Sequence, residues 1–228
     1  MSKRILVACE ESQAVTIALR EQGYEAYSCD LLPCSGGHPE WHIQDDVLEL
    51  FYAIKFYTQD RMPHFVNEWD SIISFQPCTD LSVSGARWFE QKRLSGEQEK
   101  SIRFFFEVWK HSSCSENPIG ILNGGKYVKK WFPELHKEMM DYGFPFQPTQ
   151  IIQPYMFGDP FTKTTCLWLR NLPLLKPTNI VNKGARHITK GGKSLPKWYN
   201  LPPSEDRGRI RSKTFPGLAL AMATQWKF

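Results

Sequence analysis

A cysteine at the end of an apolar run is the first residue of this chain that could do chemistry. The stretch FQPCTDLSVSG, residues 75–85, places Cys78 directly after Pro77 and ahead of small hydroxyl residues and Gly85. A cysteine most often acts as a small hydrophobic residue of a core, but its thiolate is a nucleophile. The proline before Cys78 and the small polar residues after it favour a catalytic cysteine at the edge of a sheet.

Acidic residues end or follow other apolar runs of the sequence. Asp30 ends the second run, Asp46 follows the third, and Glu116 ends the fifth together with Asn117. In open α/β sheets, ligands and catalytic groups collect at the carboxyl ends of the strands. We therefore expect these carboxylates and Cys78 to meet along one edge of one sheet. Each acid has an alternative role, as a helix cap or as part of a salt bridge.

Strands and helices must position these residues. Short apolar runs alternate with segments of helical period, and this pattern is typical of an α/β fold. We expect strands at 5–9, 25–30, 42–50, 69–77, 112–118, 150–154 and 165–170, forming a mostly parallel sheet. We expect helices at 12–23, 97–110 and 127–142, the first with Ser12 as N-cap and Gly23 as its stop. Residues 171–213 are basic and irregular, and residues 214–228 should form a terminal helix that packs on the core of residues 1–170.

Bulk composition indicates one folded domain. The chain has 228 residues, of which 41% are hydrophobic, and a formal net charge of +4, which permits a polyanionic partner without requiring one. The apolar run near residue 5 is too short for a signal peptide or a membrane span, so we expect a soluble cytoplasmic protein with no membrane partner. Its six cysteines should then be reduced thiols.

The motifs resemble those of a known family. The order and spacing of ILVACEES, CD, QDDV, QPCTDLSVSG, SENPIG, GDPFTKTTCLWLR and SKTFPGLALAMATQW resemble the motif series of the cytosine-5 DNA methyltransferases. They are more closely similar to short methyltransferase-like proteins of bacteriophages and prophages, and the resemblance covers nearly the whole chain. It implies a Rossmann-like S-adenosylmethionine-dependent methyltransferase fold with a reduced target-recognition insert at 171–213. For a phage protein, the expected location is the cytoplasm of the bacterial host.

The resemblance implies a mechanism for the residues singled out above. The Cys78 thiolate would add to carbon 6 of cytosine, which makes carbon 5 nucleophilic. Glu116 would hold the N3 edge of the base as an acid. Asn117 would orient the neighbouring loop and Pro77 would fix the backbone so that the sulfur points into the pocket. Lys163 lies in the segment where the larger enzymes carry an arginine that helps to hold the base.

The same resemblance implies S-adenosylmethionine as the methyl donor. Asp30 would accept hydrogen bonds from the ribose, Asp46 would lie near the adenine amino group, and the turn 8–12 would pass the methionine moiety. The terminal segment 214–225 would close over the donor. The other residues that the resemblance places at this cofactor are Ala8, Cys9, Glu10, Ser12, Leu31, Val47 and Gln76.

DNA is the expected partner, and a cytosine in a duplex would have to be flipped out of the stack. Residues assigned to nucleic-acid contact are Ser82, Ser84, Lys183, Arg186, Lys190, Arg209 and Arg211. The basic segment has an alternative role as a solvated loop. Two other functions stay open: a regulatory DNA-binding protein that has lost donor binding, and a methylase of a cytosine nucleotide. The sequence does not determine the oligomeric state.

One cluster of thiols and imidazoles raises a metal-binding hypothesis. Cys29, Cys34, His38 and His42 lie close together in CDLLPCSGGHPEWH and could hold zinc tetrahedrally. Cys29 should lie in a strand, however, and the spacing is not one of the common zinc-finger spacings. We therefore expect no metal, and we expect GGHPEW to form an active-site loop.

Overall fold

Seven strands form one mixed sheet in the computed structural model, which describes residues 2–189, 191–192, 194–196, 204 and 211–228. The sheet strands are β1 (Arg4–Ala8), β2 (Glu25–Asp30), β3 (His42–Gln44), β6 (Ser71–Ser74), β7 (Cys114–Pro118), β8 (Gln150–Ile152) and β9 (Thr165–Leu169). Their order is β3-β2-β1-β6-β7-β9-β8, with β9 antiparallel to both neighbours and the other pairs parallel. The first five follow the strand order of a doubly wound sheet. The expected α/β fold with a mostly parallel sheet is confirmed, and it is compatible with a Rossmann-like fold.

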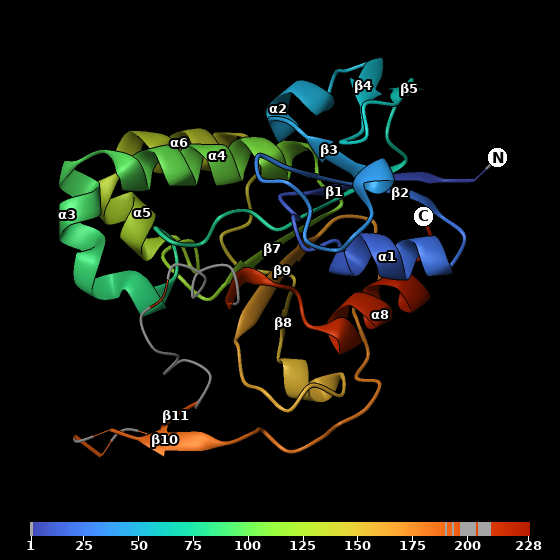
Figure 1. Cartoon of the computed structure of the whole chain (residues 1–228). Helices are drawn as coiled ribbons and strands as arrows, with labels where there is room; N and C mark the ends of the chain where they lie inside the picture. Colours follow the sequence, from blue (N-terminus) through green and yellow to red (C-terminus); the bar gives the residue numbers. More distant parts are fainter. Residues whose placement is uncertain (1, 190, 193, 197–203, 205–210) are drawn as a thin grey trace.

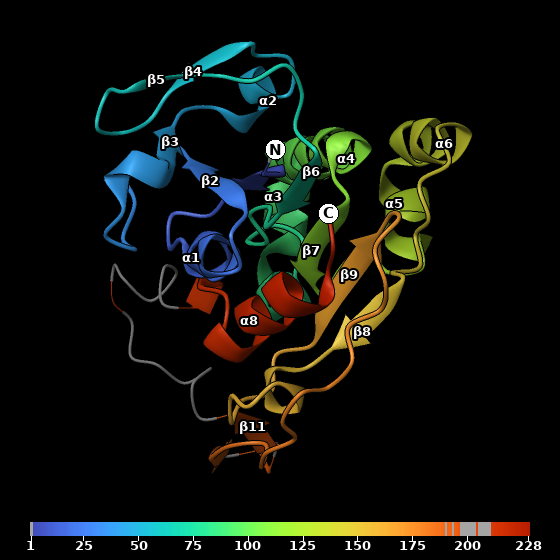
Figure 2. The same ribbon diagram turned by 90° about the vertical axis from the view of Figure 1, so that its right-hand side faces the viewer.

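Helices cover both faces of this sheet (Figures 1 and 2). They are α1 (Ala14–Glu21), α2 (Val47–Leu50), α3 (Phe89–Leu94), α4 (Glu97–His111), α5 (Lys126–Trp131), α6 (Pro133–Asp141) and α8 (Pro216–Gln225). Short 3-10 helices are η1 (Pro39–Trp41), η2 (Val83–Trp88) and η3 (Pro154–Met156), and two hairpins pair β4 (Lys55–Tyr57) with β5 (Pro63–Phe65) and β10 (Arg186–Ile188) with β11 (Ser194–Pro196). Helices α1 and α8 lie together on one face, and α4 lies on the other (Figure 2).

The alternation of side chains along β1 explains why both faces are covered. Ile5 and Val7 pack in the core cluster with α1 and α8, whereas Leu6 and Ala8 pack in the cluster that includes Val108 of α4. Successive side chains of a strand point to opposite faces. A strand that is apolar at every position therefore needs cover on both sides.

The terminal helix returns to the core as expected. Its apolar residues Leu218, Ala219 and Met222 are buried in the cluster that also holds α1. It begins at Pro216, because proline has no N–H to leave unpaired and its fixed φ suits the first turn of a helix. The segment 214–228 therefore covers the same face of the sheet as α1.

The expected start of the first helix and the expected end of the third strand were wrong. The helix expected at 12–23 begins at Ala14, and its N-cap is Gln13 in the left-handed conformation instead of Ser12. The third strand ends at Gln44, because Asp46 accepts the N–H of Leu48 and starts α2 within the range expected to be a strand.

The helix expected at 127–142 is divided into α5 and α6. Pro133 cannot donate the backbone hydrogen bond that a continuous helix needs, so the first helix ends before it and the second begins at it. Helix α3, η2 and the hairpin of β4 and β5 were not expected, because none has a sustained apolar period.

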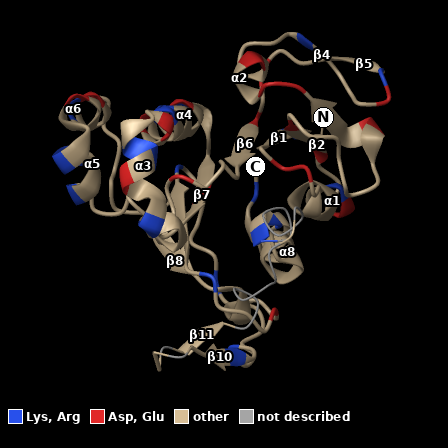
Figure 3. Cartoon of the chain, turned by 60° about the vertical axis from the view of Figure 1, so that its left-hand side comes forward, with Lys and Arg blue, Asp and Glu red and all other residues tan. Residues whose placement is uncertain are grey.

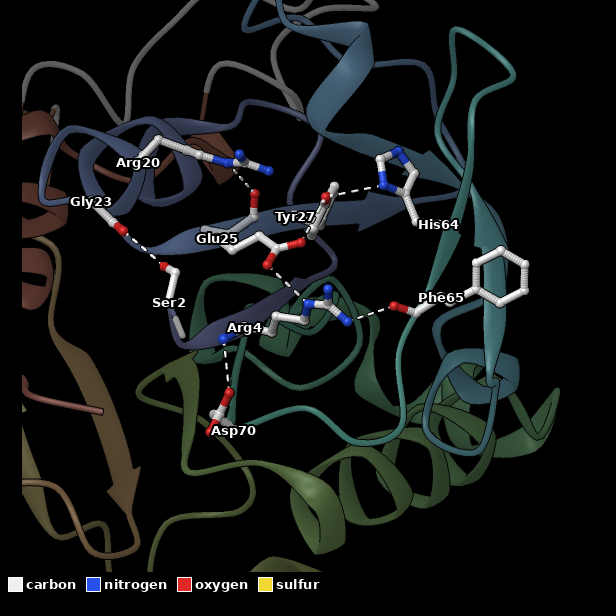
Figure 4. Close-up of polar contacts among 10 residues, drawn as sticks. Ser2, Arg4, Arg20, Gly23, Glu25, Tyr27, His64, Phe65 and Asp70 are labelled. Carbon is white, nitrogen blue, oxygen red and sulfur yellow. Dashed lines mark hydrogen bonds and ion pairs between the residues drawn. The ribbon is translucent and has the colours of Figure 1, made fainter.

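The amino ends of β1 and β2 are held by a polar network (Figure 4). The Arg4 guanidinium donates to Glu25 at 2.9 Å and to the carbonyl of Phe65 at 2.5 Å, and its backbone N–H donates to Asp70 at 2.8 Å. Tyr27 joins Glu25 to His64. This network ties β5 to the end of the sheet opposite the carboxyl ends of its parallel strands.

Within the described part of the chain, every helix is too short or too polar to cross a bilayer.

Candidate functional site

The thiol expected to be catalytic lies in the loop that follows β6, and it is half-buried. The carbonyl of Cys78 accepts the N–H groups of Leu81 and Ser82 at 3.1 and 2.9 Å, which makes a tight turn just after Pro77. Leu81 is fully buried and anchors this turn to the core beside α4. Cys78 is therefore held by a fixed backbone, and part of the residue remains exposed.

Glu116 lies in β7 and Lys163 lies just before β9, and both act on Cys78 although they are far from it in the sequence. Burial raises the pKa of Cys78, the charge of Lys163 lowers this pKa, and Glu116 raises it, so both charges act on the sulfur. Glu116 is 7% exposed and Lys163 is 9% exposed. The expected convergence of Cys78, Glu116 and Lys163 at one edge is therefore present.

The state of these groups follows from their surroundings. Burial raises the pKa of Glu116, while Lys163 and a hydrogen bond from Thr165 lower it. Glu116 is thus easier to keep as a neutral, proton-donating acid than an exposed glutamate. Cys78 is a thiol at neutral pH because its pKa lies above the ordinary value of 9.0. Lys163 would stabilise a thiolate once the proton leaves.

Hydrogen bonds join the thiol loop to β7. Asn117 donates its amide to the carbonyl of Gln76 at 3.4 Å, and the Gln76 amide donates to the Ser115 hydroxyl at 3.2 Å. Asn117 therefore contacts the loop that it was expected to orient. The Gln76 side chain, expected at the cofactor, points between β6 and β7, and its Oε1 is buried with no partner among the described residues.

A glycine that sequence reasoning missed sets the distance between the two loops. Gly120 forms a β-bridge with Ser82, and a Cβ at Gly120 would lie 2.1 Å from the carbonyl oxygen of Leu81. The loop after Cys78 and the loop after Glu116 can approach this closely only with glycine at 120. Its signal in the sequence was the PIG tripeptide after Glu-Asn.

The turn expected to carry the methyl donor lies beside Asp30 and Asp46. Burial raises the pKa of Cys9, and Asp30 and Asp46 raise it further, so both carboxylates lie near the Cys9 sulfur. The turn has no glycine, yet Cys9 and Gln13 have φ of 58° and 57°. It therefore has the left-handed backbone that glycine most easily supplies, at some cost in strain.

Asp30 and Asp46 also make local hydrogen bonds. Asp30 accepts the N–H of Leu32 at 3.0 Å, and burial raises its pKa. Asp46 caps α2 through the N–H of Leu48 at 3.0 Å, so the helix-cap role left open for it is present. Each carboxylate has a second oxygen that these bonds do not use.

The other residues expected at the cofactor differ in how much surface they expose. Val47 and Ala8 are buried in the core, and the carbonyl of Ala8 accepts the N–H of Phe75. Leu31 is 71% exposed beside Asp30. Ser12 is half-buried, and its carbonyl lies against Gly36 of the loop that follows β2. Of these, Leu31 and Ser12 offer surface to a ligand, whereas the side chains of Val47 and Ala8 do not.

Glu10 caps α1 instead of facing a ligand. Its carboxylate accepts the N–H of Val15 at 2.6 Å and the N–H and hydroxyl of Thr16 at 3.2 and 2.8 Å. Burial raises the pKa of Glu10 from 4.5 to about 7 against these hydrogen bonds. This explains the wrong N-cap: an acid three residues before Gln13 satisfies the first N–H groups of the helix.

The four residues of the zinc hypothesis make other contacts. His42 is buried between the Ser28 hydroxyl at 2.8 Å and the carbonyl of Leu32 at 2.9 Å, and the Cys29 sulfur donates to the carbonyl of Asp45. His38 stacks on Trp41, and Cys34 is half-buried. No group of three potential ligands that could hold a metal exists among the residues in the described ranges.

The residues assigned to nucleic-acid contact are dispersed. Ser82 accepts the N–H of Ser84 at the start of η2, close to Cys78 in sequence, and Ser84 is exposed. Lys183 lies over the Tyr155 ring at 5.2 Å, and Arg186 donates to Ser194 across the hairpin of β10 and β11. Lys190 and Arg209 lie outside the described residues.

Arg211 is the basic residue of this set whose charge acts on the thiol. Its charge lowers the pKa of Cys78, as that of Lys163 does. Positive charge is also present away from the basic segment, on α3 and α5 (Figure 3). A second cation at the thiol was not expected, because Arg211 is far from Cys78 in sequence.

The chain matches no model of a known protein family and no curated protein.

Proposed function

We propose that this protein is a Rossmann-like, S-adenosylmethionine-dependent cytosine-5 methyltransferase that acts on DNA. The observation that carries the proposal is the half-buried thiol of Cys78 with a buried acid, Glu116, and a buried cation, Lys163, acting on it. A thiol that only filled space in a core would need neither group. Burying an ionisable acid and a cation is costly, which favours a site with a chemical task.

The proposed reaction uses these residues in order. Cys78 gives its proton to water and adds its sulfur to carbon 6 of cytosine, while Lys163 offsets the negative charge of the thiolate. Glu116 donates a hydrogen bond or its proton to N3, where negative charge gathers during the addition. Carbon 5 is then electron-rich and would bond to the methyl carbon as the bond from that carbon to the donor sulfonium breaks, with S-adenosylhomocysteine as the leaving group. Water would then take the proton from carbon 5, and the electrons of that C–H bond would expel the sulfur and restore Cys78.

The donor side of the site lies along the same sheet edge. Asp30 would accept hydrogen bonds from ribose hydroxyls, and Asp46 would lie at the adenine side, with the turn of Cys9 between them and the thiol loop. S-adenosylmethionine supplies an electrophilic methyl group when it is bound. Strand β1 lies between β2 and β6 in the sheet, so the turn after β1 separates Asp30 from Cys78.

Covalent trapping tests the nucleophile. DNA with 5-fluorocytosine keeps fluorine on carbon 5, which cannot leave as the proton does, so the sulfur–carbon bond persists after methyl transfer. We expect an adduct stable to denaturing electrophoresis for the native protein with S-adenosylmethionine, and none for Cys78→Ala. The matched control is Cys34→Ala, which should keep the adduct. An adduct that survives in Cys78→Ala excludes Cys78 as the nucleophile.

A second function has one observation in its favour. The carboxylate of Glu10 accepts the N–H groups at the N-terminus of α1, where many Rossmann-like folds bind an anionic part of a cofactor. Because these N–H groups are already paired, the arrangement is consistent with a DNA-binding protein that has lost donor binding. Calorimetry separates the two functions, since only the methyltransferase should bind S-adenosylmethionine.

The substrate class can be measured with the same protein. Methyl transfer to duplex DNA, single-stranded DNA and deoxycytidine nucleotides should be compared at equal cytosine concentration. Activity on either DNA form supports the proposal, whereas activity on the nucleotides alone would identify a nucleotide methylase.

A further inference from the structure

Helix α5 carries three lysines on one face. Lys126, Lys129 and Lys130 lie at positions i, i+3 and i+4, which are neighbours on the surface of a helix, and all three are exposed. Val128 lies on the other side of the helix and is buried in the cluster that includes Phe105 of α4. The lysine face therefore points away from the core and gathers positive charge in one place.

This arrangement of lysines acts against the helix that carries it. Like charges at positions i and i+4 repel each other, as Lys126 and Lys130 do, and cost roughly 0.2–0.5 kcal/mol per pair. Helix α5 has no acidic residue that could offset the repulsion. Solubility does not require lysines at these three positions. An anionic partner bound across them would remove the repulsion.

An arginine of the preceding helix extends the same surface. Arg93 of α3 donates to the hydroxyl of Tyr127 at 3.1 Å, and its guanidinium lies 3.8 Å from the centre of the Trp131 ring. The Lys130 ammonium lies 4.5 Å from the centre of the same ring. An indole ring attracts cations to its face, so Trp131 holds both charges in place while part of it stays exposed. We call this surface the α5 face, and its residues are Arg93, Lys126, Lys129, Lys130 and Trp131.

The cations of the α5 face have no acidic partner, unlike a cation of the neighbouring helix. Arg103 of α4 is paired with Glu99 and Glu138. Among the residues that the structure describes, no ion pair includes a cation of the α5 face. Glu90 and Glu134, the acids closest to this face in the sequence, form no such pair with it. Its positive charge is therefore left for a partner.

The α5 face is joined to the candidate site through the backbone. The loop 119–125 leads from β7, which contains Glu116, to α5, and Gly120 in this loop forms a β-bridge with Ser82 of the thiol loop. A DNA strand that presents a cytosine to Cys78 has phosphates on both sides of that base. Figures 1 and 3 show α5 apart from the hairpin of β10 and β11, so this face is separate from the basic segment.

We propose that the α5 face binds the phosphate backbone of DNA beside the target cytosine. Lysine and arginine are the usual partners of phosphate oxygens, and a duplex offers one negative charge per about 1.7 Å of its length. Nucleic acids also bring bases, which stack on exposed aromatic rings such as that of Trp131. An acidic protein would match the charge but would not explain the indole between the cations. The inference rests on the proposed function for the identity of the partner.

The salt dependence of DNA binding tests the inference without methyl donor. Fluorescence anisotropy of a labelled duplex is measured between about 50 and 200 mM salt. In the α5 variant, Lys126, Lys129 and Lys130 are each replaced by Gln, which keeps a high helix propensity. Each lost phosphate contact should lower the slope of log affinity against log salt by about 0.9, so we expect a fall of about 2 to 3. The matched control loses the same net charge through Gln at three other exposed lysines, Lys3, Lys100 and Lys137, and should keep the native slope.

The other outcomes overturn the inference. Equal slopes in the α5 variant and the native protein would show that the α5 face is only solvated, while the proposed function stands. An equal fall in the α5 variant and the control would assign the effect to total charge and not to this face. If the native protein binds no DNA, the inference falls together with the DNA substrate of the proposed function.

A single substitution keeps the test decisive if circular dichroism shows that the α5 variant does not fold. Lys126→Gln should lower the slope by about 0.9, and Lys100→Gln should leave it unchanged. Equal slopes in these two variants would exclude phosphate contact by Lys126. Loss of methyl transfer with DNA binding retained would bear on the proposed function alone, because the binding measurement uses no donor.

Discussion

At the scale of single residues, the candidate site combines a thiol that resists ionisation with charges that act on it in opposite directions. Burial and Glu116 raise the pKa of Cys78, while Lys163 and Arg211 lower it. A thiol kept protonated in the free protein is protected from oxidation and alkylation, because the thiolate is the reactive form. The two cations then set how easily substrate binding can release the proton.

Lys163 should therefore control the reactivity of Cys78. In Lys163→Met the pKa of Cys78 should rise further, because the charge that lowers it is gone. We expect slower alkylation of Cys78 by iodoacetamide than in the native protein at every pH from about 7 to 10, measured by mass spectrometry of the modified peptide. Lys137→Met, at an exposed position of α6, is the control and should leave the rate unchanged. Equal rates in Lys163→Met and the native protein would show that the cation does not act on the sulfur.

Glu10 should make stability depend on pH. Its pKa is 4.5 in the ordinary state and about 7 in the folded protein, so the folded state binds the proton more tightly. Its stabilising contribution is complete below about pH 4.5 and is lost as the pH rises through about 7, on the order of 3 kcal/mol in free energy of unfolding.

Urea unfolding at several pH values measures this contribution. Glu10→Gln cannot ionise, so its free energy of unfolding should fall less over this range than that of the native protein. Glu21→Gln, at the exposed end of the same helix, should behave like the native protein. An identical pH dependence in Glu10→Gln and the native protein contradicts the raised pKa.

At the scale of elements, the site depends on two loops that pair after their strands end. The N–H of Ile121 donates to the carbonyl of Leu81 at 2.9 Å, and the N–H of Val83 donates to that of Ile119 at 3.1 Å. These bonds hold the Cys78 loop against the continuation of β7. The distance between thiol and acid is therefore set by backbone pairing.

Gly120→Ala should disturb this pairing. The new Cβ would meet the carbonyl of Leu81, and backbone atoms cannot move aside without breaking the bonds to Ile121 or Val83. We expect a loss of roughly 1–3 kcal/mol in free energy of unfolding, together with loss of the 5-fluorocytosine adduct. Gly191→Ala is the matched control, because its Cβ would enter open space. Unchanged stability and unchanged adduct in Gly120→Ala would show that the two loops tolerate separation.

At the scale of the whole molecule, a modest net charge of +4 is spread over several elements. Lys183 and Arg186 lie on the segment that leads into and forms β10, at the end of the molecule away from α4 (Figures 1 and 2). Both are exposed. Contacts of such residues to phosphates would contribute to affinity in a strongly salt-dependent way.

Binding to DNA should therefore weaken with salt, and this segment should contribute to the slope. The double variant Lys183→Glu with Arg186→Glu should reduce the slope of log affinity against log salt by about 2, measured by fluorescence anisotropy between about 50 and 200 mM salt. Lys100→Glu on α4 is the control and should have little effect. If the double variant keeps the native slope, the basic segment is a solvated loop.

The sequence by itself determined the parts of the fold that depend on neighbouring residues. The apolar runs indicated the strand that ends before Cys78 and the strand that contains Glu116, because alternation along a strand is a local property. The same reasoning placed Asp30 and Asp46 on that edge and predicted that the terminal helix returns to the core. The sequence-based prediction was wrong where a residue more distant along the chain makes the contact. Glu10, and not Ser12, accepts the first N–H groups of α1.

Only the tertiary structure decided which distant residues meet. Strand β9 enters the sheet antiparallel between β7 and β8, and this brings Lys163, just before it, to Glu116 near the end of β7. The loop of Gly36 also folds back over the turn after β1, where the N–H of Ser35 donates to the carbonyl of Glu11 at 2.8 Å. These contacts join residues that are far apart along the chain. Their free energy comes from packing and burial of the whole fold, which no local pattern of residues encodes.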